Sequence, residues 1–132
     1  MKLPDEKIKN AFDAYSEKAN EFLADQGKFD LLMKDAEDVA SDIPVLGPVL
    51  SDLMTMIALA KSYIHGEYRD APTKTVIAII ATAIYVVSPV DLIPDAIPVA
   101  GYADDAAMVA FVLRQIGKDV ESYRDWRNEH EA

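Results

Sequence analysis

Apolar side chains recur at steps of three and four residues through most of this chain, which is the spacing of one face of an α-helix. The pattern predicts an amphipathic helix over residues 5–23 and another over residues 28–40, so that residues 1–42 form an N-terminal region of amphipathic helices. Gly27 lies between the two helices and is predicted to end the first one. Such faces can bind a partner, but most are buried, so we expect both to contact the core.

A third helix is predicted from Val49 to His65, after residues 43–48, whose prolines and glycine interrupt the helical pattern. Gly66 is a natural end for this helix, because glycine readily adopts the backbone conformation that closes helices. His65 therefore lies at a helix C-terminus, where we expect it to interact with the last carbonyl groups rather than with a metal. The same interpretation applies to His130 near the end of the chain.

Residues 75–90 contain no charged side chain. We predict a helix over residues 73–87, with Pro72 near its start, because the run is long for a buried strand and rich in alanine. It is apolar on all sides, as in a central core helix or a membrane segment. A bilayer span needs about 20 apolar residues, and Asp91 interrupts the run. We therefore favour the core helix and keep membrane insertion as the alternative.

The last helix is predicted from Ala103 to about Arg127, with Tyr123 and Trp126 closing over the core near its end. Together these patterns predict an all-α fold, in which residues 1–132 form a single domain of about five helices. The apolar helix over residues 73–87 is central, and residues 88–104 form a corner rich in proline and aspartate.

Composition narrows the classes of function. The 132 residues carry 13 basic and 23 acidic side chains, for a formal net charge of −10, and no cysteine. This negative charge repels the phosphates of nucleic acids and of anionic lipids, so we do not expect the protein to bind nucleic acid. The first ten residues lack a continuous apolar segment, so no secretory signal is expected, and the absence of cysteine suits a reducing compartment.

Four aspartates lie at the predicted corner, in a segment from residue 75 to residue 113 that contains no lysine or arginine: Asp91, Asp95, Asp104 and Asp105. Carboxylates in apolar surroundings must be hydrogen-bonded, paired or bound to metal. The favoured interpretation is structural, with Asp91 and Asp95 accepting hydrogen bonds in turns and the other two stabilising the start of the last helix. Alternatively, all four bind Mg²⁺ or Ca²⁺, which prefer oxygen ligands, or they anchor a basic partner or a membrane interface. More distant cations available for pairing are Arg69, Lys61 and Lys34.

The sequence of this corner and of residues before it resembles the signature of a known family. Residues from Ser88 to Asp105 read S-P-V-D-L-I-P-D-A-I-P-V-A-G-Y-A-D-D, with Tyr85 ahead of them, and upstream lies Gly66-Glu67-Tyr68-Arg69-x-x-Pro72. These runs resemble the signature of the YkvA-like family, a bacterial domain of unknown function. The similarity covers about residues 45–127, with the signature over residues 70–108. The resemblance implies a small helical protein with no established activity, in a family whose apolar run often leads to predicted membrane association.

The sequence therefore favours a small helical interaction or scaffold protein over an enzyme, because no arrangement of nucleophile and base and no phosphate-binding loop is recognisable. The alternative is a metal-dependent activity at the aspartates, and no cofactor other than Mg²⁺ or Ca²⁺ is expected. A protein partner is predicted without a basis for identifying it, and the oligomeric state is left open. We expect the protein in the cytoplasm. The resemblance to the family adds a possible association with the inner membrane.

Overall fold

A computed structural model describes residues 5–42, 47–87 and 103–131 of the chain. These segments form five helices and contain no strand: α1 (Asp5–Leu23), α2 (Gln26–Ser41), α3 (Gly47–Ile64), α4 (Thr73–Val87) and α5 (Ala103–Glu131). The predicted all-α class is confirmed, and the bounds of the first and fourth helices are those predicted. The third helix begins two residues earlier than predicted, and the last continues beyond Arg127 to Glu131.

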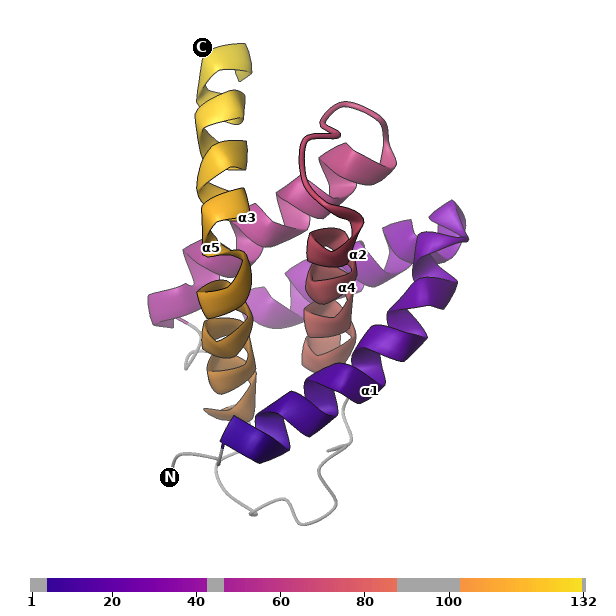
Figure 1. Cartoon of the computed structure of the whole chain (residues 1–132), viewed down its shortest axis with the longest axis vertical. Helices are drawn as coiled ribbons and strands as arrows, with labels where there is room; N and C mark the ends of the chain where they lie inside the picture. Colours follow the sequence, from indigo (N-terminus) through magenta and orange to yellow (C-terminus); the bar gives the residue numbers. More distant parts are fainter. Residues whose placement is uncertain (1–4, 43–46, 88–102, 132) are drawn as a thin grey trace.

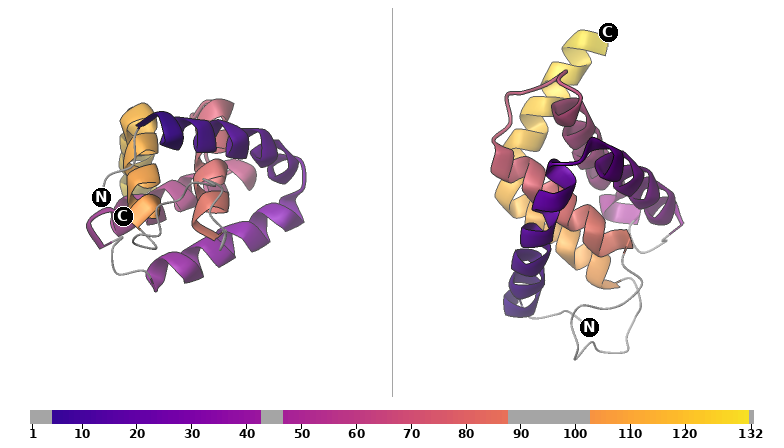
Figure 2. Two further views of the ribbon diagram at one scale, coloured as in Figure 1. Left: turned by 90° about the horizontal axis from the view of Figure 1, so that it is seen from below. Right: turned by 90° about the vertical axis from the view of Figure 1, so that its right-hand side faces the viewer.

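Helix α4 is the centre of the molecule and contacts each of the other four helices (Figure 1). Helices α1 and α2 lie on opposite sides of it, and α5 runs beside it, as Figure 2 shows. Eleven of its fifteen residues are buried, including the largest aliphatic side chains Ile79 and Ile80. The charge-free run of this helix, which begins at Thr75, is thus explained by burial against protein, and this confirms the predicted core helix. No helix within the described segments has the length and apolarity that a bilayer crossing requires.

The connection between α1 and α2 differs from the prediction. Gly27 does not end the first helix, because it is the second residue of α2. The chain turns at Ala24 and Asp25 instead, and Asp25 has an extended backbone with its carboxylate accepting a 3.1 Å hydrogen bond from the N–H of Lys28. An aspartate in this position satisfies an amide that the first turn of a helix leaves unpaired. The capping side chain therefore fixes the boundary here, and the glycine does not.

The connection from α3 to α4 contains Gly66, whose φ of 82° is the left-handed conformation expected of a glycine that closes a helix. The next two backbone N–H groups, of Glu67 and Tyr68, both donate to the carbonyl of Ser62. The prediction for His65 is wrong, since its Nε2 lies 3.0 Å from a carboxylate oxygen of Asp30 on α2. That neighbour comes from the packing of α2 beside α3, which the local sequence does not reveal.

Helix α5 has 29 residues and extends past the other helices at its C-terminal end (Figure 1). Three aromatic rings cover the core there: Tyr123 lies 5.1 Å from Tyr68 and 5.7 Å from Trp126, measured between ring centroids. The predicted closure of the core by Tyr123 and Trp126 is therefore confirmed. His130 stacks on Trp126, and its Nδ1 lies 2.7 Å from the carbonyl oxygen of Trp126, as expected for a histidine near a helix end.

Candidate functional site

The four aspartates of the predicted corner fall mostly outside the described residues. Asp91 and Asp95 lie between α4 and α5, in the part of the chain for which no structure is described. Asp104 and Asp105 belong to the first turn of α5, which begins at Ala103, so their predicted place at a helix start is confirmed for the backbone. The side chains of these two residues are likewise outside the description, and binding of Mg²⁺ or Ca²⁺ stays a prediction. Among the described residues, no group of three or more acidic or histidine side chains could hold a metal ion.

Two of the three distant cations considered as partners for these aspartates have other neighbours. Lys61 on α3 pairs with Glu37 on α2, with 3.1 Å between its Nζ and the carboxylate oxygen. Arg69 lies over the ring of Tyr63, with its guanidinium carbon 5.0 Å from the ring centroid. Lys34 is exposed on α2. Lys61 therefore helps to hold two helices together, far along the chain from the predicted corner.

A groove of about 850 Å³ is lined by residues of α1, α4 and α5 and by the residue before α4. Its apolar lining consists of side chains from all three helices and from the residue before α4: Phe12, Pro72, Ile77, Ala78 and Ile116. Phe12 also makes an edge-on contact with Phe111, with 5.7 Å between ring centroids, so this wall is fixed by core packing. The other seven lining residues are polar or charged, so the groove combines an apolar wall with polar groups, and its volume is within the range of binding sites.

One short hydrogen bond fixes the polar side of this groove. The hydroxyl of Thr75 donates to Oδ2 of Asp119 across 2.6 Å, joining the first turn of α4 to the middle of α5. Thr75 is almost fully buried, while Asp119 keeps partial access to solvent. Charge-assisted hydrogen bonds of this length are among the stronger ones in proteins. The carboxylate is therefore held in one orientation at the groove.

The charges of the groove differ from those of the protein as a whole. Lys74 and Lys118 are exposed, line the groove, and form no ion pair with any described residue. Of the two lining aspartates, Asp119 accepts the bond from Thr75 and Asp13 pairs with Lys9 at 3.7 Å. The lining therefore carries two positive and two negative charges and is neutral overall, although acidic side chains outnumber basic ones by 23 to 13 in the chain.

Two titratable groups near the C-terminal half of α5 have shifted pKa values. Burial raises the pKa of Tyr68 above 10, and the nearby charges of Asp70 and Asp119 raise it further. A hydrogen bond to Asp52, 2.6 Å long, is the main cause that raises the pKa of Arg124. Both shifts have structural causes, because Tyr68 belongs to the aromatic cluster and Arg124 joins α5 to α3.

Sequence reasoning did not find this groove. Its residues come from three helices and are separated by up to about a hundred positions, and no local motif connects Phe12, Thr75 and Asp119. Lys74 borders the segment without basic residues, but Lys118 lies beyond Arg114 at the other end of it. That the two lysines line one groove depends on how α4 and α5 pack.

Comparisons with known proteins match the central helix and residues beyond it. Residues 75–111 match the sequence profile of a family described as "Protein of unknown function (DUF1232)". The chain is also 31% identical over 78 residues to a Bacillus subtilis (strain 168) protein named "Uncharacterized membrane protein YkvA", and the alignment covers 59% of this chain and 74% of YkvA. No solved structure matches the chain significantly. The profile begins at Thr75, so its first part coincides with the buried residues of α4.

Proposed function

The chain belongs to the YkvA-like family of proteins of unknown function, and we propose that it acts as a non-catalytic helical interaction protein. The groove between α1, α4 and α5 is its binding site, and the occupant is an amphipathic, acidic segment of a partner protein. Apolar residues of that segment contact the walls of the groove, and its carboxylates contact Lys74 and Lys118.

The observation that carries this proposal is the pair of free lysines. Lys74 and Lys118 come from different helices, line the same groove, and have no carboxylate partner among the described residues. Opposite charges across an interface increase the association rate and select the partner. The lining is neutral overall, with two lysines and two aspartates, in a protein of net charge −10. Its two exposed, unpaired lysines are the groups that an acidic occupant would contact.

The hydroxyl groups at the groove also favour binding over catalysis. The hydroxyl of Thr75 donates a hydrogen bond to Asp119, and the hydroxyl of Ser16 donates one to the carbonyl of Phe12, one turn earlier on α1, at 2.8 Å. A nucleophilic hydroxyl must reach its substrate as well as a neighbouring base, and Thr75 is almost fully buried. The partner of Ser16 is a backbone carbonyl, which is not a base. We therefore assign both hydroxyls to the shape of the site.

The test uses a defined peptide and two matched double variants. A labelled helical peptide with leucine on one face and glutamate on the other is titrated against the protein, and binding is followed by fluorescence anisotropy. We expect a micromolar Kd at low salt that weakens as salt screens the charges. The double variant Lys74→Glu with Lys118→Glu should raise Kd by at least about tenfold, which corresponds to about 1.4 kcal/mol.

The control is the double variant Lys18→Glu with Lys34→Glu, which makes the same change of net charge at two exposed lysines outside the groove. It should leave Kd within about twofold, since remote exposed charges are screened. Equal weakening by both double variants, or equal binding of a peptide carrying lysine in place of glutamate, contradicts the proposal. The native partner can then be sought with a photocrosslinker at Gln115, and a crosslink counts only if the groove variant abolishes it.

We infer further that the protein is cytoplasmic and attaches to the inner membrane through its partner. The support is that YkvA is named a membrane protein, whereas here the apolar residues of α4 are buried by other helices. The net charge of −10 also opposes direct contact with anionic lipid. In a fractionation experiment, the protein should sediment with membranes and be released by high salt, and the groove variant should remain in the supernatant. Release by detergent alone would contradict this mode of attachment.

A further inference from the structure

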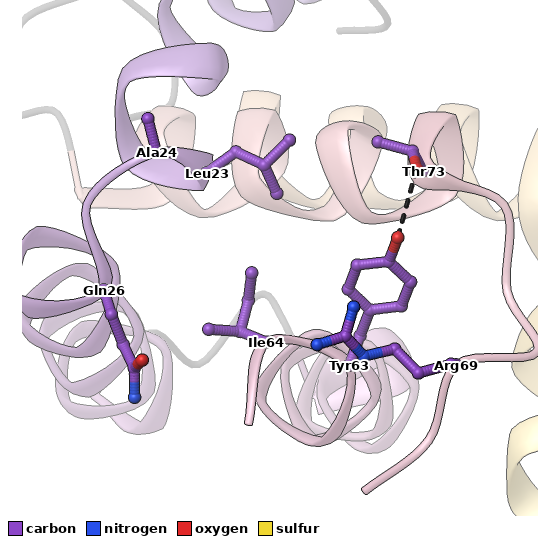
Figure 3. A pocket seen from close by; sticks show the side chains of 7 residues that line it. All are labelled: Leu23, Ala24, Gln26, Tyr63, Ile64, Arg69 and Thr73. Carbon is purple, nitrogen blue, oxygen red and sulfur yellow. Dashed lines mark hydrogen bonds between the residues drawn. The ribbon is translucent and has the colours of Figure 1, made fainter. Parts of the chain in front are cut away.

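A second hollow, separate from the groove, lies between the α1–α2 turn and the ends of α3 and α4 that face it (Figure 3). Its volume is about 430 Å³. Leu23 and Ile64 face each other across it, and Tyr63, Arg69 and Thr73 supply polar groups on one side, as Figure 3 shows. The hollow therefore has an apolar part and a polar part, and its size suits a small organic molecule.

The cationic group of this hollow has no anion among the described residues. The guanidinium of Arg69 lies over the Tyr63 ring, 5.0 Å from its centroid, and no described carboxylate is within ion-pair distance. Stacking on an aromatic ring restricts a guanidinium without using its N–H donors. In a chain with 23 acidic side chains, Arg69 is exposed and thus presents an unpaired fork of donors beside the hollow.

Two hydroxyl groups add a further donor. Tyr63 Oη and Thr73 Oγ1 are 3.1 Å apart and share one hydrogen bond, which uses only one of their two O–H protons. The other proton is available to an acceptor in the hollow. The polar side of the hollow therefore offers a positive charge and donors, and the ligand that complements it carries a negative charge and acceptor oxygens.

We propose that this hollow binds a small organic carboxylate with a short apolar body. The carboxylate accepts hydrogen bonds from Arg69 and from the Tyr63–Thr73 hydroxyl pair, and the apolar body lies between Leu23 and Ile64. A free inorganic anion would leave these two apolar side chains without a contact, so the apolar walls favour the organic ligand.

The experiment uses phenylacetate as the probe. Phenylacetamide, which has nearly the same shape but no charge, is the control ligand. Binding is followed by the amide NMR signals of the ¹⁵N-labelled protein. We expect saturable shifts at Tyr63, Ile64 and Thr73 with a Kd of about 1 mM for phenylacetate. The amide should bind at least about tenfold more weakly, because it carries no charge for the guanidinium.

The variant Arg69→Gln should weaken phenylacetate binding by at least about tenfold. The matched control is Arg127→Gln, which removes another guanidinium that lies over a tyrosine ring, 5.4 Å from the centroid of Tyr123 and outside the hollow. It should leave Kd within about twofold, and unchanged signals elsewhere show that both variants are folded. Equal affinity for the acid and the amide, unchanged affinity in the Arg69 variant, or no saturable shift up to about 20 mM overturns the proposal. Tighter binding of inorganic phosphate at the same signals would also overturn it, since the apolar walls would then play no part.

Discussion

The hydroxyl of Thr75 donates a 2.6 Å hydrogen bond to the carboxylate of Asp119 and so connects α4 to α5 on the polar side of the groove. Thr82, two turns later on α4, is also buried, but its hydroxyl donates to the carbonyl of Ala78 within the same helix. The two threonines thus belong to the same helix and are both buried. They differ in that only the hydroxyl of Thr75 joins two helices.

This difference predicts different costs for the same substitution. Thr75→Val keeps the shape of the side chain and removes the donor to Asp119, so it should lower the free energy of unfolding by about 1–2 kcal/mol. Thr82→Val removes a hydrogen bond to a carbonyl that the helix already satisfies, and should change stability by less than about 0.5 kcal/mol. Urea denaturation with an unchanged m-value measures both. Equal costs for the two variants would show that the contact with Asp119 contributes nothing of its own.

The raised pKa of Tyr68 predicts a loss of stability at alkaline pH. In the unfolded chain this phenol loses its proton near pH 10, but in the folded protein burial holds the proton to higher pH. Between these two pKa values the unfolded state binds fewer protons, so stability is complete below pH 10 and falls as pH rises toward the folded pKa. The slope contributed by one group is at most about 1.4 kcal/mol per pH unit.

The variant Tyr68→Phe isolates this effect. It keeps the ring contacts with Tyr123 and Trp126 and removes the titrating group, so the alkaline decrease in unfolding free energy should become shallower. Urea denaturation across the alkaline range measures this slope. If both proteins show the same slope above pH 10, the phenol of Tyr68 is not perturbed in the folded state.

The sequence was sufficient to predict helices whose own residues show which side is buried. The spacing of apolar residues predicted α1, and the charge-free run predicted α4, because a buried face or a fully buried helix is apolar in sequence. It was insufficient where a contact joins distant elements. The partner of His65 is Asp30, and the groove combines Phe12, Thr75 and Asp119, so both follow from helix packing that no local pattern encodes. At Gly27, two local signals conflicted, and the cap at Asp25 determined the helix boundary.

The contact between α5 and α3 at Arg124 predicts a modest coupling energy. Arg124 bonds Asp52 at 2.6 Å and Glu121 at 2.7 Å, and the Arg124 and Asp52 side chains are 29% and 37% exposed. Because solvent screens pairs that are this accessible, a double-mutant cycle with Arg124→Gln and Asp52→Asn should give a coupling of about 0.5–1 kcal/mol. The cycle with Glu121→Gln, within one helix and more exposed, should give about 0.2–0.5 kcal/mol. High salt should reduce both couplings, and a larger coupling for Glu121 would contradict the assignment of Asp52 as the main partner.

Replacing Gly66 and Gly117 by alanine should have opposite effects on the free energy of unfolding, because the two glycines differ in backbone conformation. Gly66 has a φ of 82°, where a side chain is strained, so Gly66→Ala should lower the unfolding free energy by about 1 kcal/mol. Gly117 lies within α5, and an added methyl group would meet no atom within 4 Å. Gly117→Ala should therefore raise the unfolding free energy by about 0.5–1 kcal/mol, because alanine loses less backbone entropy in a helix. Thermal and urea denaturation of the two single variants and their double variant check the signs. The two residues belong to separate elements, so the effects should add. A destabilising Gly117→Ala would mean that this face of α5 contacts another surface.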